Sequence, residues 1–542
     1  MLAKSASLLQ TDIVNQATTG GLPTVGTLIS PSTIKSGIMN VNSGWKSESM
    51  LNSLVCFIQN KSPILAQITD VMTSNPFMDP ESNLGRGNMS YIASHGRIPH
   101  TEHSDTRFAE LEFICQLSVN QSRSKLRNSP DIGLTVVNAE KQILETFFPF
   151  HYPEHLGLGK YLGTELVLPL DVESITTVHC GIFGITGWGK SVLQAYLAAL
   201  LVRAGNKVLI FDHSGDYASP GSPVRMIFEK LVKDFKVHKA NEIRADHDLF
   251  AIKIKDTDIW EKMFGTTAAK ANQIAEDIIS SILDKYPDDT NLATLDGSKI
   301  IEILEEAIPL IFGNRTVTAK LDLLRARKIL IVDWFDKNIT VLLKRPITFK
   351  DVIDNSLLRN SAVVIDLTGE DMTLSEKCLY LHKIGRLMYE RAKHVYEKEA
   401  KRKLGVVTIV DEAHNYVPER SIEDGGSWQK RSKSLLTTLA KEGRKYGIGV
   451  CLADQRITAV DKDAIDFQTY FLGKLQMKGD QDHVKSMFGD SALTAMSVLR
   501  KYQFIVVGGA NPLEDVAAPI QVFDPNKDLQ FVDEMHPQIR RT

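Results

Sequence analysis

Short apolar runs separated by turn residues characterise the first part of the chain, up to about residue 152. Clusters of Gly, Pro, Asn and Ser lie between these runs. Strands of this length with turn residues at both ends are typical of antiparallel sheets. We therefore predict a small antiparallel β-barrel here, after a loose arm over residues 1–20. The predicted strands are 24–29, 53–58, 64–71 and 109–117.

From about residue 165 the pattern changes to continuous β-branched runs that alternate with helical stretches, the clearest at 191–203 and 374–401. Strands that are apolar on both faces are typical of parallel sheets covered by helices. We therefore predict an α/β core with a doubly wound sheet. Its predicted strands are 176–183, 207–212, 362–367, 406–410, 448–453, 470–475, 503–507 and 520–523.

A helical pattern interrupts this core after its second strand. Two β-branched runs, 328–335 and 339–343, end the interruption, and we interpret them as a hairpin. The predicted helices are 225–235, 258–264, 268–285, 299–312 and 318–327. The predicted parts of the chain are the arm (1–20), the barrel (21–164), the first part of the core (165–218), the helical insertion with its hairpin (219–345), the second part of the core (346–525) and a C-terminal tail (526–542).

Composition and charge exclude several classes of protein. Of the 542 residues 43% are hydrophobic and 24% are charged, as expected of a soluble chain with several cores. No apolar run of about 18 residues and no secretory signal occur, so we expect a cytoplasmic protein without a membrane span. The five cysteines form no Cys-x-x-Cys pair, which argues against a zinc ribbon or a disulfide framework. With a net charge of -3, any contact with nucleic acid must be local.

The clearest chemical motif is Gly-x-x-x-x-Gly-Lys-Ser, which lies between an apolar strand and a helical stretch. In this setting backbone N–H groups and the positive helix end surround the phosphates of ATP. Lys190 would neutralise the β- and γ-phosphate oxygens, and the Ser191 hydroxyl would coordinate Mg²⁺. The residues predicted to bind the nucleotide are Gly184, Gly187, Trp188, Gly189, Lys190 and Ser191.

A second motif places acidic residues at the end of a predicted strand. Hydrolysis needs a carboxylate in the Mg²⁺ shell and a group that orients water. We predict that Asp411 holds Mg²⁺ through its water shell and that Glu412 polarises the attacking water. Asp333 and Asp366 also end apolar runs, but no acidic residue follows either of them. His414 is expected to make a local hydrogen bond, because no second histidine lies at ligand spacing.

Two downstream residues have roles that spacing alone leaves open. Gln455 follows a predicted strand, where its amide either senses the γ-phosphate or caps the strand end. Arg444 precedes that strand, and it either reaches the nucleotide of a neighbouring subunit or is solvated. The segment 425–433 combines glycines with three cations, which indicates a mobile DNA-binding loop or an ordinary solvated loop.

Together these motifs resemble the HerA group of the HerA/FtsK ATPases. The segment 26–31, followed by 64–68, also resembles the small β-barrel of that family. The chain departs from the family pattern at Asp216, where glutamate is common, and at Ala453-Asp454, where a small hydroxyl residue is more usual. Whether Asp216 is catalytic stays open. The motifs that carry the resemblance, besides the glycine-rich loop, are Asp212-His-Ser-Gly-Asp-Tyr217, Asp411-Glu-Ala-His-Asn415, Glu442-Gly-Arg-Lys445 and Asp454-Gln-Arg456.

The resemblance implies a RecA-like P-loop NTPase core in a homo-oligomeric ring, most commonly a hexamer. Such a ring hydrolyses ATP with Mg²⁺ and moves duplex DNA through its channel. The resemblance also implies that Asp411 and Glu412 are the Walker B pair, that Gln455 is the sensor and that Arg444 acts in trans as a catalytic residue. An effector partner is implied as well, either a NurA-like nuclease in DNA repair or an antiviral defence effector such as a sirtuin-like protein.

Two alternatives stay open. In a nucleotide-gated scaffold ring, ATP binding would assemble and activate an effector without moving DNA. A DEAH-type superfamily-two helicase would match the literal Asp-Glu-Ala-His. Against the helicase, no Gln-Arg-x-Gly-Arg-x-Gly-Arg motif follows Asp411, and a second RecA-like core is missing.

Overall fold

The computed structural model describes residues 23–45, 50–75, 105–118, 122–255, 257–312, 314–369, 372–420, 426–464 and 467–539. The predicted arm over residues 1–20 lies outside these ranges. The chain divides into two compact units. The first holds the residues up to Gly205, residues 453–458 and the residues from Phe467 onward, and the second holds residues 206–452 and 459–466.

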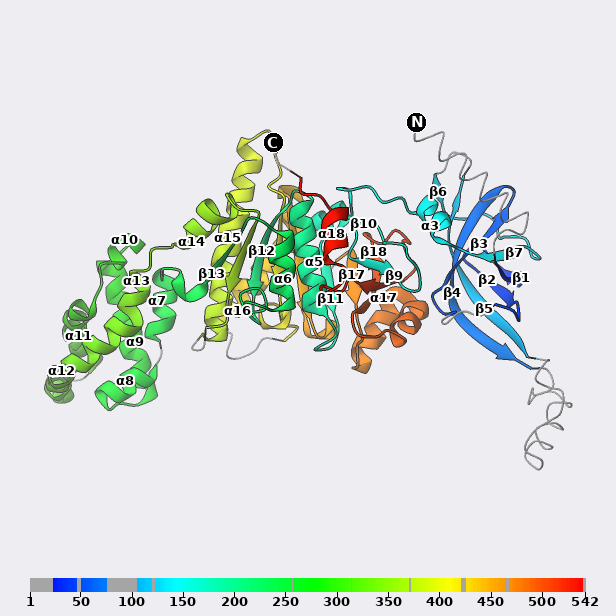
Figure 1. The fold of residues 1–542 in the computed structure, drawn as a ribbon. Helices are drawn as coiled ribbons and strands as arrows, with labels where there is room; N and C mark the ends of the chain where they lie inside the picture. The colour runs from blue at the N-terminus through cyan, green and yellow to red at the C-terminus, as the bar shows by residue number, and fades with distance from the viewer. Residues whose placement is uncertain are drawn as a thin grey trace, which may run out of the picture. The chain divides into compact units, whose positions relative to one another are not determined.

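The first unit begins with the predicted antiparallel barrel (Figure 1). The strands pair in the order β2-β1-β7-β3-β4-β5, and β2 also pairs with β5, which closes the sheet. Apolar side chains such as Leu28, Met39 and Phe57 fill its interior. The strands are β1 (Thr24–Ser32), β2 (Ser36–Val41), β3 (Leu54–Gln59), β4 (Ser62–Ser74), β5 (Thr106–Leu117), β6 (Arg123–Ser124), which extends β5, and β7 (Thr135–Asn138).

Two glycines allow the close approach of strands in this barrel. A Cβ at Gly26 would lie 2.3 Å from the carbonyl oxygen of Asn40, and one at Gly37 would lie 2.8 Å from Cζ of Phe113. Neither position could take a side chain without a shift of its neighbours. β2 was not predicted, because its six residues include Gly37 and few β-branched side chains.

The rest of the first unit contains the strand and the helix on either side of the glycine-rich loop. β11 (Cys180–Phe183) pairs in parallel with β17 (Thr469–Leu472). Three strands continue this sheet beyond β17: β18 (Gln503–Gly508), β19 (Ala518–Val522) and β9 (Gly159–Tyr161). They pair antiparallel, whereas the sequence pattern predicted parallel strands. The other elements are α3 (Lys141–Phe147), β8 (His155–Leu156), β10 (Leu170–Asp171), α4 (Val172–Val178), α5 (Lys190–Arg203), α17 (Lys478–Ser497) and, within the predicted tail, α18 (Leu529–Met535).

The strand before the glycine-rich loop begins later than predicted. Residues 176–178 belong to α4, and the Asp171 carboxylate caps this helix by accepting the N–H of Ser174 at 2.6 Å. His179 has a φ of 65° and ends the helix. The cap therefore outweighs the β-branched composition of these residues.

The second unit contains a parallel sheet in the order β13-β14-β12-β15-β16. Its strands are β12 (Lys207–Asp212), β13 (Phe235–Lys239), β14 (Ala362–Asp366), β15 (Val406–Val410) and β16 (Ile448–Asp454). The residues of β14 and β15 are buried throughout, as expected of a sheet covered on both faces. β13 was not predicted, because lysine and histidine interrupt its apolar positions. α15 (Leu374–Lys398) and α16 (Gly426–Tyr446) pack against each other.

The predicted helical insertion is present between β13 and β14 (Figure 1). α6 (Pro223–Leu231) precedes it, before β13. Three short helical turns, Ala240–Glu242, Asp336–Thr340 and Val352–Leu357, connect its parts. Its α-helices are α7 (His247–Ile254), α8 (Thr257–Phe264), α9 (Ala268–Lys285), α10 (Asp289–Leu292), α11 (Gly297–Ile311), α12 (Asn314–Phe335), α13 (Val341–Leu343) and α14 (Phe349–Asp351).

The predicted hairpin over residues 328–343 is wrong. Residues 328–335 belong to α12, and a π-helical turn joins them to α13. Ile331 and Phe335, four residues apart, are buried, whereas Ile329 is 82% exposed. The burial of one helical face therefore overrides the β-branched composition of this run.

All five cysteines are buried free thiols, in agreement with the lack of a paired cysteine motif. Within the described ranges, no helix is both long enough and apolar enough to cross a membrane. The barrel, the α/β core and the helical insertion confirm the predicted fold class.

Candidate functional site

The residues predicted to bind phosphates lie together between β11 and α5. Gly187 and Gly189 have φ values of 74° and 106°, which favour glycine, and α5 begins at Lys190. The buried Lys190 ammonium donates to the carbonyl oxygen of Gly184 at 2.8 Å. Ser191 follows in the first turn of the helix. This loop combines a lysine, a helix N-terminus and a glycine-rich backbone, which is the arrangement that binds phosphate.

Trp188 fixes the loop to the neighbouring strands of the first unit. Its indole N–H donates to the carbonyl oxygen of Gln503 at 2.9 Å, and its own carbonyl oxygen accepts the N–H of Tyr502 at 2.9 Å. The indole ring also packs against Gly473, where a Cβ would lie only 2.6 Å from Cδ1 of Trp188. These contacts hold the backbone of the loop in place from the side of β18.

Sequence reasoning missed two residues that support the loop. The Tyr502 ring covers Gly189 so closely that a Cβ there would lie 2.4 Å from Cδ1 of the tyrosine. The carbonyl oxygen of Lys474 accepts the N–H of Ile185 at 3.0 Å. Tyr502 has a φ of 64°, and no feature of the sequence marks a tyrosine that adopts this conformation.

Gln455 belongs to the same unit as the glycine-rich loop. The carbonyl oxygen of the preceding residue, Asp454, accepts the N–H of Gly184 at 3.2 Å. The Asp454 carboxylate accepts the N–H of Arg456 at 3.1 Å and so shapes the turn after β16. Gln455 therefore follows a backbone contact with the loop, and its role as sensor stays a prediction.

The second unit contains the acidic residues, at the carboxyl ends of two adjacent parallel strands. Asp212 ends β12, and Asp411 follows β15. The Ser214 hydroxyl donates to Oδ2 of Asp411 at 3.0 Å. The Asp212 carboxylate accepts the N–H groups of Gly215 and Tyr217, each at 2.9 Å. Asp212 thus stabilises the turn that brings Ser214 to Asp411.

Burial gives both aspartates a perturbed pKa. Burial, and then the charge of Glu412, raise the pKa of Asp411 to about 7. Burial raises the pKa of Asp212 to about 6, although three backbone N–H groups oppose the shift. A cation would offset the cost of burying these carboxylates close together. The Asp411 carboxylate and the Ser214 hydroxyl are oxygen ligands of the kind Mg²⁺ prefers, so the residues fit this ion.

Glu412 occupies a sharp turn directly after Asp411. Its φ of 47° and ψ of 55° lie in the left-handed region, which costs roughly 1–2 kcal/mol for a residue other than glycine. The Asn415 N–H donates to the carbonyl oxygen of Glu412 at 3.0 Å. Nδ1 of His414 lies 3.5 Å from Oε2 of Glu412. Strain of this kind is typical of functional sites. The local hydrogen bond expected of His414 stays a prediction.

Arg444 is exposed in the last turn of α16. A cation there interacts favourably with the helix dipole, so this position agrees with the solvated interpretation, and the role in trans stays a prediction. The predicted mobile basic loop is wrong for residues 426–433, because α16 begins at Gly426. The eight residues after Gly426 contain no glycine or proline that would stop a helix. Residue 425 lies outside the described ranges.

Known proteins resemble this chain over most of its length. The family model described as "Helicase HerA, central domain" matches residues 156–387. The DNA double-strand break repair helicase HerA of Sulfolobus acidocaldarius is 25% identical over 409 residues, or 75% of this chain and 74% of the relative. A protein of the same description from Sulfurisphaera tokodaii is 22% identical over 410 residues, or 74% of this chain and 75% of that relative. Among solved structures, VirB4 of Thermoanaerobacter pseudethanolicus matches with a TM-score of 0.42 and 13% identity, over 69% of this chain and 98% of that one.

Proposed function

Because the chain is a HerA-type ATPase, we propose that it forms a ring, most commonly a hexamer, that hydrolyses ATP to move duplex DNA through its channel. The observation that carries the proposal is the glycine-rich loop, where Lys190 is held over the backbone at the start of α5. The names of the relatives, which describe double-strand break repair helicases, support DNA as the substrate.

In this proposal each residue of the site has one role. The loop from Gly184 to Ser191 binds the phosphates of ATP, and Lys190 neutralises them. Ser191 and Asp411 would hold Mg²⁺, and the ion would supply charge stabilisation to the leaving phosphates. Glu412 orients and polarises the attacking water, a contribution of about 10²- to 10⁴-fold in rate for a positioned base.

Two further residues complete hydrolysis in the ring. Gln455 senses the γ-phosphate, and the backbone contact of Asp454 with Gly184 supports its placement. Arg444 reaches the nucleotide of the neighbouring subunit. Its exposure at the end of α16 permits this role, since an arginine that acts in trans must lie on the surface of its own subunit.

The ring serves an effector, either a NurA-like nuclease in DNA repair or an antiviral defence effector such as a sirtuin-like protein. The β-barrel is the proposed docking surface, because the family places its effector at that end of the ring. The competing function is a nucleotide-gated scaffold, in which ATP binding assembles the ring around an effector without moving DNA. β9 pairs with β19, so a barrel deletion must leave β9 in place.

Steady-state ATP hydrolysis with and without duplex DNA separates the two functions. A motor hydrolyses ATP faster when DNA is present, and it displaces a third strand from a triplex ahead of it. A scaffold shows the same rate with and without DNA and no displacement. The Glu412→Gln protein is the control, since it must bind ATP and fail in both assays.

A further inference from the structure

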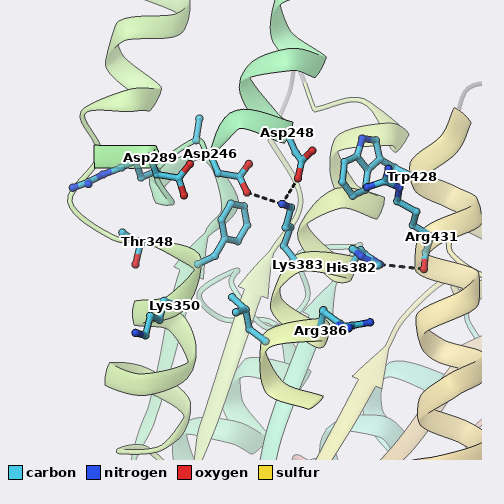
Figure 2. A pocket seen from close by; sticks show the side chains of 14 residues that line it. Asp246, Asp248, Asp289, Thr348, Lys350, His382, Lys383, Arg386, Trp428 and Arg431 are labelled. Carbon is cyan, nitrogen blue, oxygen red and sulfur yellow. Dashed lines mark hydrogen bonds and ion pairs between the residues drawn. The ribbon is translucent and has the colours of Figure 1, made fainter. Parts of the chain in front are cut away.

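A cavity of about 490 Å³ lies in the second unit between α7, residues 348–350, α15 and α16. None of the predicted nucleotide-binding or catalytic residues lines it. Figure 2 shows Lys350 at the lower left of the cavity, Arg386 below His382, and Trp428 with Arg431 at the upper right, on α16. Phe349 and Leu387 add an apolar surface. The cavity is therefore apolar inside and has cations around it.

Positive charge exceeds negative charge around this cavity. Five cationic and three acidic side chains line it, which leaves two positive charges. Two of the acids, Asp246 and Asp248, both pair with Lys383 (Figure 2). Within the described ranges, no carboxylate forms an ion pair with Arg431 or Lys350. These two cations are available to an anionic ligand.

The Arg431 guanidinium stacks on the Trp428 ring. The guanidinium carbon of Arg431 lies 4.4 Å from the centroid of the Trp428 ring, and the carbonyl oxygen of Arg431 lies 3.1 Å from Nδ1 of His382. Stacking on an indole leaves the N–H edges of a guanidinium free to bind a phosphate with two hydrogen bonds. Burial lowers the pKa of His382, and the charges of Arg431, Lys383 and Arg386 lower it further against its hydrogen bond to Arg431. The cavity thus has a positive potential at His382.

The same turns of α16 are bonded to the segment that follows the acidic pair. Nε2 of Gln429 donates to the carbonyl oxygen of Asn415 at 2.9 Å, and the Ser432 hydroxyl donates to that of Tyr416 at 2.9 Å. Gln429 and Ser432 are both buried. The Asn415 N–H in turn donates to the carbonyl oxygen of Glu412 at 3.0 Å. Two hydrogen bonds, through Gln429 and Asn415, thus connect this part of α16 with the backbone of Glu412.

We propose that this cavity binds the backbone of nucleic acid, with Arg431 as the phosphate ligand and Lys350 adding positive charge from the opposite side, and that α16 transmits its occupancy to Glu412. The inference rests on the proposed function and deepens it by naming where DNA stimulates hydrolysis. Arg431 is a binding residue, whereas Gln429 and Ser432 are positioning residues that act through Asn415 and Tyr416. An arginine that stacks on tryptophan and contacts phosphate is common in nucleic-acid recognition.

The test compares three variants of the full chain. Arg431→Ala removes the phosphate ligand, Ser432→Ala removes a transmission contact, and Lys441→Ala changes an exposed cation further along the same helix. Two quantities are measured: the affinity for a labelled 30-base-pair duplex by fluorescence anisotropy, and the ratio of the ATPase rate with DNA to the rate without it.

We expect Arg431→Ala to weaken DNA binding about tenfold, to make it less sensitive to salt and to lower the rate ratio toward one. Ser432→Ala should keep the DNA affinity and lower the ratio through kcat, whereas Lys441→Ala should behave as the unaltered protein. A rate ratio unchanged by both Arg431→Ala and Ser432→Ala overturns the inference. If Arg431→Ala changes the KM for ATP without DNA and leaves DNA affinity intact, the cavity takes free nucleotide and the assignment to nucleic acid is wrong. An unaltered protein that DNA does not stimulate refutes the proposed motor itself.

Discussion

Within the first unit, His536 links the end of the C-terminal helix α18 to Gly157 as a neutral imidazole. Its Nε2 accepts the N–H of Gly157 at 3.0 Å, so its Nδ1 carries the proton and donates to the carbonyl oxygen of Val532 at 3.1 Å. The side chain is fully buried. Arg203, the last residue of α5, donates to the carbonyl oxygens of Asp533 and His536. A second proton on the imidazole would break the bond to Gly157 beside this positive charge.

The magnitude of the effect follows from the pKa of His536. Burial is the largest cause that lowers this pKa from 6.5 to about 4; the bond to Val532 opposes the shift, and the charge of Arg203 adds to it. Between pH 4 and pH 6.5, His536 is protonated only in the form in which α18 has locally opened and its bond to Gly157 is broken. The full stability is therefore present above pH 6.5 and is lost as the pH falls toward 4. At pH 5 the loss is roughly 2 kcal/mol, or about a 30-fold larger open population.

Hydrogen–deuterium exchange measured by mass spectrometry tests this loss locally. We expect the protection of peptides over residues 150–160 and 529–539, corrected for intrinsic exchange, to fall by about 30-fold from pH 7.5 to pH 5. His536→Gln should be less protected at pH 7.5 and should lack this fall. His151→Gln, at an exposed position of the same segment, should retain it. His155 also has a lowered pKa, caused first by burial and then by the charge of His151, so its share of the fall is the same in the unaltered protein and in His536→Gln. An equal fall in the unaltered protein and in His536→Gln refutes the reasoning.

Three further predictions concern the proposed function. Lys190→Ala should abolish ATP binding, measured by nucleotide titration. Glu412→Gln should still bind ATP but lose about 10²- to 10⁴-fold in kcat, measured by steady-state rates. Normal turnover in Glu412→Gln would mean that another residue polarises the attacking water. Arg444→Ala and Glu412→Gln subunits, each inactive alone, should recover ATP hydrolysis when mixed in one ring. An arginine supplied in trans raises the rate of hydrolysis by about 10³- to 10⁵-fold. No recovery in rings shown to be mixed argues against a role of Arg444 in trans. A chain that begins near Pro153, and so retains β9, should lose co-purification with the product of the neighbouring gene; retention, with the oligomeric state checked by light scattering, would place the effector on the core.

The sequence predicted best the elements whose apolar pattern is set by burial on both faces. β12, β14 and β15 are continuous apolar runs. In the glycine-rich loop, the spacing of the glycines, the lysine and the serine is specific to phosphate binding. The secondary-structure predictions that were wrong concern segments whose local apolar pattern disagrees with their tertiary environment. The β-branched residues of α12 lie in a helix because Ile331 and Phe335 share one buried face, and β13 is a strand despite its polar residues because it pairs along β14. Neither environment is visible before the neighbouring element is known.

The residues that support the site, such as Tyr502 and Gln429, could not be predicted from the sequence for a different reason. Lys190, Asp411 and Glu412 belong to motifs because their chemistry needs particular residue types at short spacing. Their supports need only a shape or a carbonyl group, which many residues provide. Tyr502 contacts the glycine-rich loop from more than 300 positions away, and Gln429 holds Asn415 by its backbone oxygen. Such a support leaves a pattern only when its partner is a specific side chain, as with Ser214 and Asp411. Residues that are set by their own chemistry are therefore predictable from the chain, whereas the residues that support them are found only from their contacts.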